Sequence, residues 1–533
     1  MNTIMMQHCL FKDGYFHTMD TEDECYRYMG VTDGRISYLG DTRPGGYFHE
    51  CSLEERHVFP ALIDSHLHLL YTMVLQAGSC VICEIRDGRV VPDTLDGVRQ
   101  KIEEVCKTNR SKGIIVANQY IVSGIRERRM PNRQELDQWT EGRKIVLYNI
   151  DGHSSSMSTA LMKELGIYQE GCDGILTGKD HEFIQGKVME SIGKAVTPKV
   201  LARGVANFTN LCIQYGIGGV CALDGSGDVP EDKLTRMLAK IASHMDIDVR
   251  LYPQFTDLTQ AEQYRRYQST PRVGGCGVWE MDGSVGSHSA AFYSPYRDTG
   301  TKGACYYTQE QVDDMLRKAD EAGYQISSHA IGEAAIDRVL DGYARVQPRR
   351  MHRIDHFEFP TPEAVKRICA ENNLAVTVQP GFSWIDRHYL KSYEQFLPDA
   401  LIEQQVPLRT LMEHGVCVCG SSDSPVQEIN PFDQMLGMID FYRPEESLTM
   451  YQALCTYTKN PAAMLGEERD LGTLEVGKRA NFLVSDQNLL ELDRHTIGNV
   501  QIRQLYLDGK ACRRKKGSVA EFLAMMAGPG HKI

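Results

Sequence analysis

The sequence lacks the features that mark membrane and secreted proteins. No run of about 18 consecutive apolar residues occurs in the chain, so no transmembrane helix is predicted. Residues 1–30 contain no apolar stretch behind a basic flank, the pattern of a secretory signal. We therefore expect a soluble, globular protein of the cytoplasm.

Negative charge outweighs positive charge. The 58 Lys and Arg residues are outnumbered by 71 Asp and Glu residues, and the formal net charge is -13. One short basic run, residues 513–516, has the character of a solvated terminal segment. Nucleic acid and anionic membranes are therefore poor partners for this chain, and a small molecule is the expected partner.

Cysteine is plentiful, but a disulfide pattern is missing. The 16 cysteines are scattered through apolar stretches, as buried reduced thiols are. Cys80 and Cys83 have the C-x-x-C spacing, yet no second pair accompanies them. We expect no disulfide framework, and neither a metal site nor a redox site at this pair.

The middle of the chain alternates strand-like and helical patterns, which is typical of βα units around a parallel sheet. The pattern predicts an α/β fold with eight strands, the number that a (β/α)8 TIM-type barrel needs. A helix over residues 308–322 is expected to begin with the capping-box pair Thr308 and Gln311. The predicted strands are residues 57–64, 217–223, 248–254, 276–282, 323–329, 351–357, 373–379 and 415–421.

The rest of the sequence predicts how the domains are organised around these strands. Both ends of the chain consist of short strands between turns, so residues 1–58 and 470–516 are expected to form one small composite β-sandwich. The barrel then spans residues 59–469, and residues 517–533 form a C-terminal tail. Residues 70–200 contain two extra strand-like runs, at 114–117 and 144–148, and we interpret them as an insertion packed over the barrel mouth.

His66 and His68 follow the first predicted barrel strand. Side chains alternate between the faces of an extended strand, so both imidazoles point the same way, a usual geometry for binding one metal ion. Asp64 lies on the same face just before them. Alone, an H-x-H pair is more often a pair of ordinary surface or core histidines.

Further candidate ligands follow later strands. His329 ends the fifth strand, His356 the sixth, and Asp423 follows the eighth. Each has an ordinary alternative, because strand-end histidines often cap hydrogen-bond networks and Ser-Asp-Ser-Pro is a common turn. Together they form a metal-ligand set at the carboxyl ends of parallel strands, where barrel enzymes keep their chemistry.

Eight stretches, spread over nearly the whole chain, resemble the metal-dependent amidohydrolase superfamily. Within it the chain is most similar to the branch of YtcJ-like proteins and N-substituted formamide deformylases. The resemblance implies a metal-bearing barrel with a composite β-sandwich, in agreement with the strand count. The stretches are FPALIDSHLHL (59–69), DGHSSSMSTALM (151–162), DGSVGSHSAAFYSPYRD (282–298), SHAIGEAAIDRVLDGY (328–343), HRIDHFEF (352–359), VTVQPGF (376–382), GSSDSPV (420–426) and LGTLEVGKRANFLV (471–484).

The resemblance also implies roles for individual residues. His66, His68 and Asp423 are expected to hold a first divalent metal ion, most simply Zn²⁺, and Asp423 to shuttle the proton. A second ion, where one is present, is expected at His329 and His356. The position of His153 in the family faces the substrate, although His153 can equally be an ordinary turn histidine.

Two positions depart from the family pattern. Many relatives carry a lysine on the fourth strand whose carbamate bridges two metal ions, whereas this chain has Val278 and Trp279 there. Glu280 lies on the same strand face as Val278 and can serve as the bridge; a mononuclear site, with Glu280 supporting a ligand or contacting substrate, is the equal alternative. His288 stands where relatives commonly have arginine, which indicates a different substrate group.

The substrate pocket is thinly specified by the sequence. Gln379 and Trp384 follow the seventh strand and are candidates for its wall, together with Phe382. Aromatic residues on a barrel loop serve packing as often as recognition. No cluster of basic residues indicates a phosphate or polyanionic substrate.

These features predict a metal-dependent hydrolase that cleaves a non-peptide C–N bond in a small amide, formamide or cyclic amide. Metal-activated water attacks the carbonyl carbon, and Asp423 acts as general base and then general acid. The alternatives are deamination or isomerisation in a related site, or a catalytically silent binding or regulatory relative. A homodimer would be common among such barrels, but no interface stripe marks one.

Overall fold

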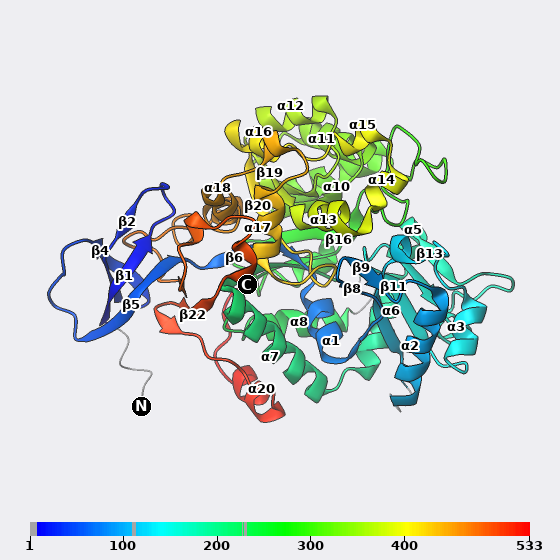
Figure 1. The fold of residues 1–533 in the computed structure, drawn as a ribbon, viewed down its shortest axis with the longest axis horizontal. Coiled ribbons are helices and arrows are strands. Elements are labelled where there is room, and N and C mark those ends of the chain that lie inside the picture. Colours follow the sequence, from blue (N-terminus) through cyan, green and yellow to red (C-terminus); the bar gives the residue numbers. More distant parts are fainter. Residues whose placement is uncertain (1–7, 109–112, 226, 229–231) are drawn as a thin grey trace.

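The computed structural model describes the chain apart from residues 1–7, 109–112, 226 and 229–231, so the start of the predicted N-terminal segment lies outside it. The centre of the molecule is an α/β layer of parallel strands with helices packed outside them (Figure 1). Three of these strands form one sheet in the order β15-β14-β6. They are β6 (Leu62–Leu67), β14 (Ile217–Asp224) and β15 (Asp248–Pro253).

The other five central strands form a second parallel sheet in sequence order. They are β16 (Arg272–Glu280), β17 (Gln325–Ala330), β18 (His352–His356), β19 (Leu374–Val378) and β20 (Cys417–Gly420). The two sheets touch where β15 lies beside β16 and where β20 lies beside β6. Within the described residues the hydrogen-bonded ladders remain two sheets, so the fold is TIM-barrel-like and no closed ring of ladders is present.

Two predicted strand boundaries are wrong for physical reasons. The predicted strand 57–64 divides at Ala61, because its first half ends β5 (His49–Pro60) of another sheet and its second half begins β6. The fourth strand starts at Arg272, four residues earlier than predicted. Arg272 is fully buried yet polar, so the hydrophobic pattern missed it.

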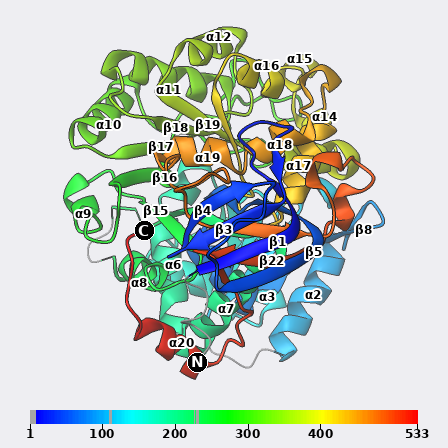
Figure 2. The ribbon, with the colours of Figure 1, turned by 90° about the vertical axis from the view of Figure 1, so that its left-hand side faces the viewer.

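Both ends of the chain meet in one sheet of eight strands, which faces the viewer in Figure 2. β5 is its centre: Val58 lies opposite Phe16 on one side and Val484 on the other. The main path of this sheet is β23-β22-β21-β5-β1-β3-β4. Its strands besides β5 are β1 (His8–His17), β2 (Cys25–Tyr26), β3 (Tyr28–Thr32), β4 (Arg35–Gly40), β21 (Phe482–Ser485), β22 (Ile502–Leu507) and β23 (Lys510–Ala511).

Residues after β6 build a separate small sheet that reaches the central strands from one side (Figure 1). The runs predicted at 114–117 and 144–148 are its strands β10 (Ile115–Tyr120) and β11 (Ile145–Asn149). They pair in parallel and have a hydrophobic core of their own, under helix α2 (Leu95–Thr108). The sheet is completed by β7 (Cys80–Val81), β12 (Ser154–Met157) and β13 (Ile175–Thr177).

The start of the helix predicted at residues 308–322 follows the capping-box rule. The predicted helix is α10 (Gln309–Glu321), and the Thr308 hydroxyl accepts from the Gln311 amide while the Gln311 side chain accepts from the Thr308 amide, which confirms the capping box.

The tail contains α20 (Val519–Met526), which packs on α7 (Pro198–Tyr215). None of the described helices combines the length and apolar character that a membrane crossing requires.

Candidate metal and substrate site

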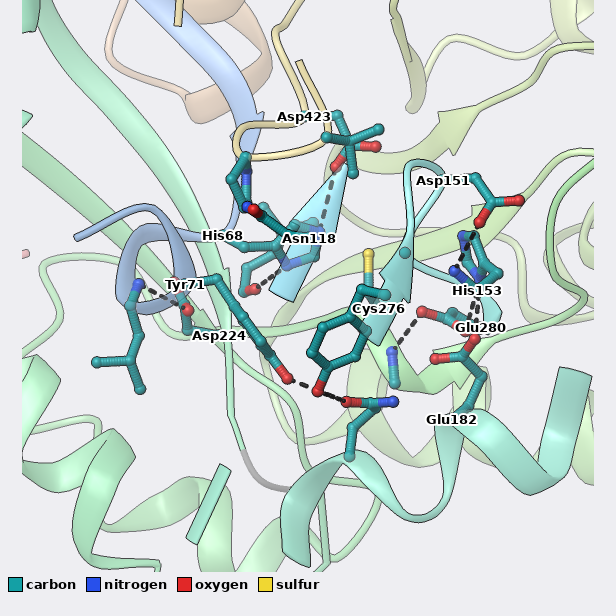
Figure 3. A pocket seen from close by; sticks show the side chains of 18 of the residues that line it. His68, Tyr71, Asn118, Asp151, His153, Glu182, Asp224, Cys276, Glu280 and Asp423 are labelled. Carbon is teal, nitrogen blue, oxygen red and sulfur yellow. Dashed lines mark hydrogen bonds and ion pairs between the residues drawn. The ribbon is translucent and has the colours of Figure 1, made fainter. Parts of the chain in front are cut away.

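A cavity of about 130 Å³ opens at the carboxyl ends of the central strands (Figure 3). A water molecule occupies about 10–15 Å³ by the same measure, so the cavity has room for a small molecule. Strand-end residues such as His68 and Asp423 form one part of the wall. The small sheet and the helices after it supply another part, including Asn118, His153 and Glu182.

His66, His68 and Asp423 meet at one point. Nε2 of His66 and Nε2 of His68 each lie 3.1 Å from Oδ1 of Asp423. The backbone fixes this approach, because the Asp423 amide donates to the His66 carbonyl and the His68 amide donates to the Ser424 carbonyl, both at 2.8 Å. Asp423 is thereby held against two histidines that lie more than 350 positions before it in the sequence.

The donors at this point suit a cation. Nδ1 of His68 donates to the Leu223 carbonyl at 3.1 Å, so the lone pair of the neutral ring is on Nε2, which faces Asp423. Oδ1 of Asp423 is buried and has no hydrogen-bond partner. Buried acceptors that face one another without a donor are costly unless a metal ion or a proton lies between them.

His356 is presented in the same way. Its Nδ1 donates to Oε1 of Gln379 at 2.9 Å, which leaves the buried Nε2 unpartnered. One donor atom each of His356, His66 and Asp423 lies within 4.8 Å of the others. Gln379 was expected at the wall of the pocket; the structure instead places it behind His356, where it fixes the tautomer of the ring.

His329 ends β17 beside His356, with 4.5 Å between ring centroids. It is buried, and neither of its ring nitrogens has a hydrogen-bond partner. Burial and the neighbouring His356 lower the pKa of His329 well below its ordinary value, so the ring stays neutral and both a donor and an acceptor are unused. Such a ring is available to a second ion or to a substrate group.

Charge at the site depends on whether a cation is bound. Burial disfavours the charged ring of His66, but the carboxylates of Asp423 and Asp355 raise its pKa to about 9. Burial likewise opposes ionisation of Asp423, yet His66 and His68 lower the pKa of Asp423 well below its ordinary value. A metal-free molecule therefore holds a proton on His66, and an ion that binds there displaces it.

Two of these residues have unusual backbone conformations. His356 has φ of 71° and Asp423 has φ of 56°, in the left-handed region that non-glycine residues seldom adopt. Residues held in this region cost free energy and cluster at functional sites. The strain supports a functional role for the strand ends that carry His356 and Asp423.

A second polar cluster lies across the cavity. Nδ1 of His153 is 2.9 Å from Oε1 of Glu182 and 3.8 Å from Oε2 of Glu280. Burial opposes its charge, but Glu182 and then Glu280 raise the pKa of His153 to about 10. Burial and the nearby Glu182 raise the pKa of Glu280 well above its ordinary value, so the cluster consists of an imidazolium, a carboxylate and a carboxylic acid.

Glu280 is thus brought to His153 rather than to the His66–His68 pair. The reason is an irregularity in β16: Gly275 lies opposite Ser328, but Glu280 lies opposite the very next residue, His329. The four residues between Gly275 and Glu280 leave the ladder, which resets the face that each side chain occupies. The face assignment made for Glu280 from regular alternation therefore does not apply.

His288 and Trp384 lie outside the cavity lining. His288 is bound to Asp298, with Nε2 3.0 Å from Oδ2, and packs against Tyr296 and Phe396. Trp384 stacks on His388 and donates to Asp440. Both were expected to contact substrate, and the structure brings neither to the cavity.

Sequence reasoning missed three residues of the site. Cys276 enters it through the irregular part of β16, and the glycines on either side of it were the available signal. Glu182 is the last residue of the short helix α5 (Gly178–Glu182) beside the small sheet and carried no signal. Asp224 accepts from the amides of Leu69 and Leu70 and so anchors the turn after His68; its place at the end of a predicted strand could have revealed it.

Parallel strands in an α/β fold, with histidine and aspartate donors at their carboxyl ends around a cavity, define the class of metal-assisted hydrolases. The chain belongs to the amidohydrolase family, whose family model matches residues 50–512. It is accordingly an enzyme, a hydrolase that acts on carbon–nitrogen bonds.

Known proteins agree with this assignment. YtcJ of Bacillus subtilis is 23% identical over 95% of this chain and 99% of its own length. The N-substituted formamide deformylase of Arthrobacter pascens is 24% identical over 94% of this chain and 97% of its own length. The structure of a metal-dependent hydrolase of Pyrococcus furiosus, uncharacterised in function, matches with a TM-score of 0.69 at 21% identity, over 91% of this chain and all of that one, which supports the fold.

Proposed function

We propose that the protein hydrolyses a non-peptide C–N bond of a small amide, formamide or cyclic amide, with water activated by a divalent metal ion. The observation that carries this proposal is that the buried Nε2 of His356 and Oδ1 of Asp423, both without hydrogen-bond partners, meet a ring nitrogen of His66 at the edge of the cavity. His66, His68 and Asp423 would hold the first ion, and His329 with His356 a second. The formamide deformylase among the relatives supports the choice of bond.

The ion, when bound, polarises the substrate carbonyl and lowers the pKa of water. The chain's own residues supply the remaining chemistry. Asp423 lines the cavity, so its carboxylate can take a proton from the attacking water and return it to the leaving nitrogen, which must be protonated to depart. Nitrogen and carboxylate donors together favour Zn²⁺ over Mg²⁺ or Ca²⁺, which prefer oxygen alone.

The lining also restricts the substrate. Among the described residues it contains the carboxyl groups of Asp151, Glu182, Asp224, Glu280 and Asp423, and no lysine or arginine. An anionic substrate would meet repulsion there, whereas one or two divalent ions neutralise much of the charge. We infer that the substrate is neutral or cationic, with its apolar part against Leu70, Tyr71, Met189 and Val426.

The architecture around the site belongs to the same proposal. We propose that the eight central strands act as a (β/α)8 barrel of residues 59–469, with an insertion at 70–200 that forms the far wall of the cavity. Residues 1–58 and 470–516 would be a composite β domain, and 517–533 a tail that packs on α7 and bonds to Ser243 and Tyr267 of the central region. His153 and Glu280 would then contact substrate from the insertion side of the site.

The test is metal content together with turnover. Protein purified without added metal is analysed for metal per chain, beside a Glu280→Gln variant, and both are assayed on a panel of amides, formamides and cyclic amides with metal titrated in. We expect one or two equivalents of metal, with turnover that follows occupancy. A fall from two equivalents to one in the variant would assign Glu280 as a bridge, and about one equivalent in both proteins would assign a mononuclear site. Bound metal without turnover on any substrate would overturn the proposal in favour of a silent relative.

A further inference from the structure

We propose that Cys276 is a direct ligand of the metal ion, so that a thiolate joins His66, His68 and Asp423. The inference rests on the metal site proposed above and adds a donor of different chemistry to it. Sγ of Cys276 lies 3.6 Å from Nε2 of His66. One donor atom each of Cys276, His66 and His68 lies within 4.8 Å of the others.

The spacing is that of two ligands of one ion. Zinc lies about 2.05 Å from a histidine nitrogen and about 2.3 Å from a thiolate sulfur. Two such ligands at a tetrahedral angle are about 3.6 Å apart, the same as the Sγ–Nε2 distance. The distance between Cys276 and His66 therefore matches that of two zinc ligands at a tetrahedral angle.

The unpartnered atoms at the site supply independent evidence. Oδ1 of Asp423 and Nε2 of His356 are buried without hydrogen-bond partners beside His66. Cys276 lines the same cavity as Asp423 and His68, and Figure 3 shows its sulfur between them and the His153–Glu280 side. Among the cysteines in the described part of the chain, it is the one that belongs to a group of potential metal donors.

The backbone is built to bring Cys276 there. β16 has four residues between Gly275 and Glu280 where β17 has none, and Cys276 is the first of them. Gly275 has φ of 106° and Gly277 has φ of 66°, values that favour glycine on both sides of the cysteine. A Cβ at Gly275 would lie 2.8 Å from Cβ of Leu223, so only glycine fits. Bulges of this kind re-aim a side chain toward an active site.

The alternative is that Cys276 is a buried thiol that serves only packing. Its surroundings distinguish this role from that of a metal ligand. Cys276 does belong to a hydrophobic cluster that includes Leu223 and Tyr252. Its sulfur, however, faces a histidine nitrogen rather than a backbone carbonyl, which is where Cys417 and Cys83 direct theirs. A thiolate is a soft donor, so the site should prefer Zn²⁺, Co²⁺ and Cd²⁺ to Mg²⁺ and Mn²⁺.

Cobalt spectroscopy tests the ligand directly. The wild-type enzyme, Cys276→Ala and Cys221→Ala are stripped of metal, loaded with Co²⁺ and examined for the near-ultraviolet charge-transfer band that a cobalt–thiolate bond produces. Cys221 is a fully buried thiol of β14 outside the cavity lining, and its variant is the matched control. We expect the band in the wild type and in Cys221→Ala and its loss in Cys276→Ala, with metal affinity lowered by more than about 100-fold, beyond the 10–100-fold that supporting contacts contribute.

The outcomes separate this inference from the proposed function. A wild-type protein that binds Co²⁺ without the band, or a Cys276→Ala variant that keeps it, would overturn the thiolate ligand and leave the metal site standing. No binding of Co²⁺ or Zn²⁺ by the wild type would overturn both. Should Cys276→Ala fail to fold, X-ray absorption of the zinc-loaded wild type decides, since a ligand sulfur appears at about 2.3 Å from the metal.

Discussion

The polar side chains at the two ends of the central strands differ in how they are paired. Near the amino ends, two partly exposed carboxylates face buried or half-buried guanidinium groups: Glu467 binds both Arg250 and Arg272, and Asp248 binds Arg479. At the carboxyl ends, Asp423 and His356 keep buried atoms without partners. The comparison teaches that carboxylates near the amino ends are paired with guanidinium groups, which serves stability, whereas carboxylate and imidazole acceptors at the carboxyl ends stay open for a cation or substrate.

Asp423→Asn should have the largest effect, and it should fall on activity. The amide cannot accept the proton of the attacking water, so we expect turnover to fall by at least about 10³-fold and metal to bind more weakly. Steady-state kinetics and metal titration measure this, with circular dichroism to verify folding. Asp440→Asn, whose carboxylate binds Trp384 outside the cavity, is the control and should retain turnover. Turnover near normal in Asp423→Asn would remove the role assigned to Asp423.

Glu467→Gln should lower the stability of the protein through the amino ends of the central strands and leave the metal site unchanged. It leaves Arg250 and Arg272, both buried, without their shared carboxylate, at a cost of about 3 kcal/mol in the free energy of unfolding. Denaturant unfolding measures the loss, and metal content per folded chain should stay unchanged. Asp470 lies close to Glu467 in the sequence, and Asp470→Asn breaks only an exposed pair with Arg35, so it should cost less than about 1 kcal/mol. A loss of metal in Glu467→Gln would contradict the division of roles between the two ends.

Gln379→Ala should have an intermediate effect on the metal site. Without the amide oxygen, the tautomer and orientation of His356 are no longer fixed, and we expect metal affinity to fall by about 10–100-fold. Competition with a chromophoric chelator measures the affinity. Gln379→Glu keeps an acceptor and should restore most of it, whereas His288→Ala, outside the cavity, should leave it unchanged. An unchanged affinity in Gln379→Ala would show that His356 is not a ligand.

The smallest effect concerns the pH dependence of stability. Because its pKa rises from 6.5 to about 10 on folding, His153 contributes stability that is complete below pH 6.5 and is lost as the pH rises through about 10. Melting temperatures of metal-free protein between these pH values should therefore decline more steeply in the wild type than in His153→Gln. Parallel curves would mean that the pair with Glu182 contributes no stability.

The sequence was sufficient for the repeating parts of the fold and for the ligands at regular strand ends. The strands that carry His329 and His356 follow hydrophobic patterns, so their ends could be located within a residue or two. It was insufficient where the backbone is irregular. The bulge in β16 depends on contacts with β14 and β17, and neither the position of Cys276 nor that of Glu280 follows from strand alternation.

Contacts between distant segments were equally beyond the sequence. Glu182 meets Glu280 only because the small sheet closes over the strand ends. The sequence around residue 182 does not predict a contact with a residue almost a hundred positions later. His288 shows the converse: its match to a family position indicated a substrate contact, but Asp298 and two aromatic rings hold it elsewhere.

Because both chain ends form one sheet, that sheet can be completed only late in synthesis. β5 obtains β1 as a neighbour at once, but its other neighbour, β21, is made roughly 420 residues later. At translation rates of about 5–20 residues per second, the open edge of β5 waits on the order of 20–80 seconds on the ribosome. An unpaired strand edge can recruit other chains during that time. The nascent protein therefore needs that edge shielded, by a chaperone or by its own early contacts, until the last part of the sheet emerges.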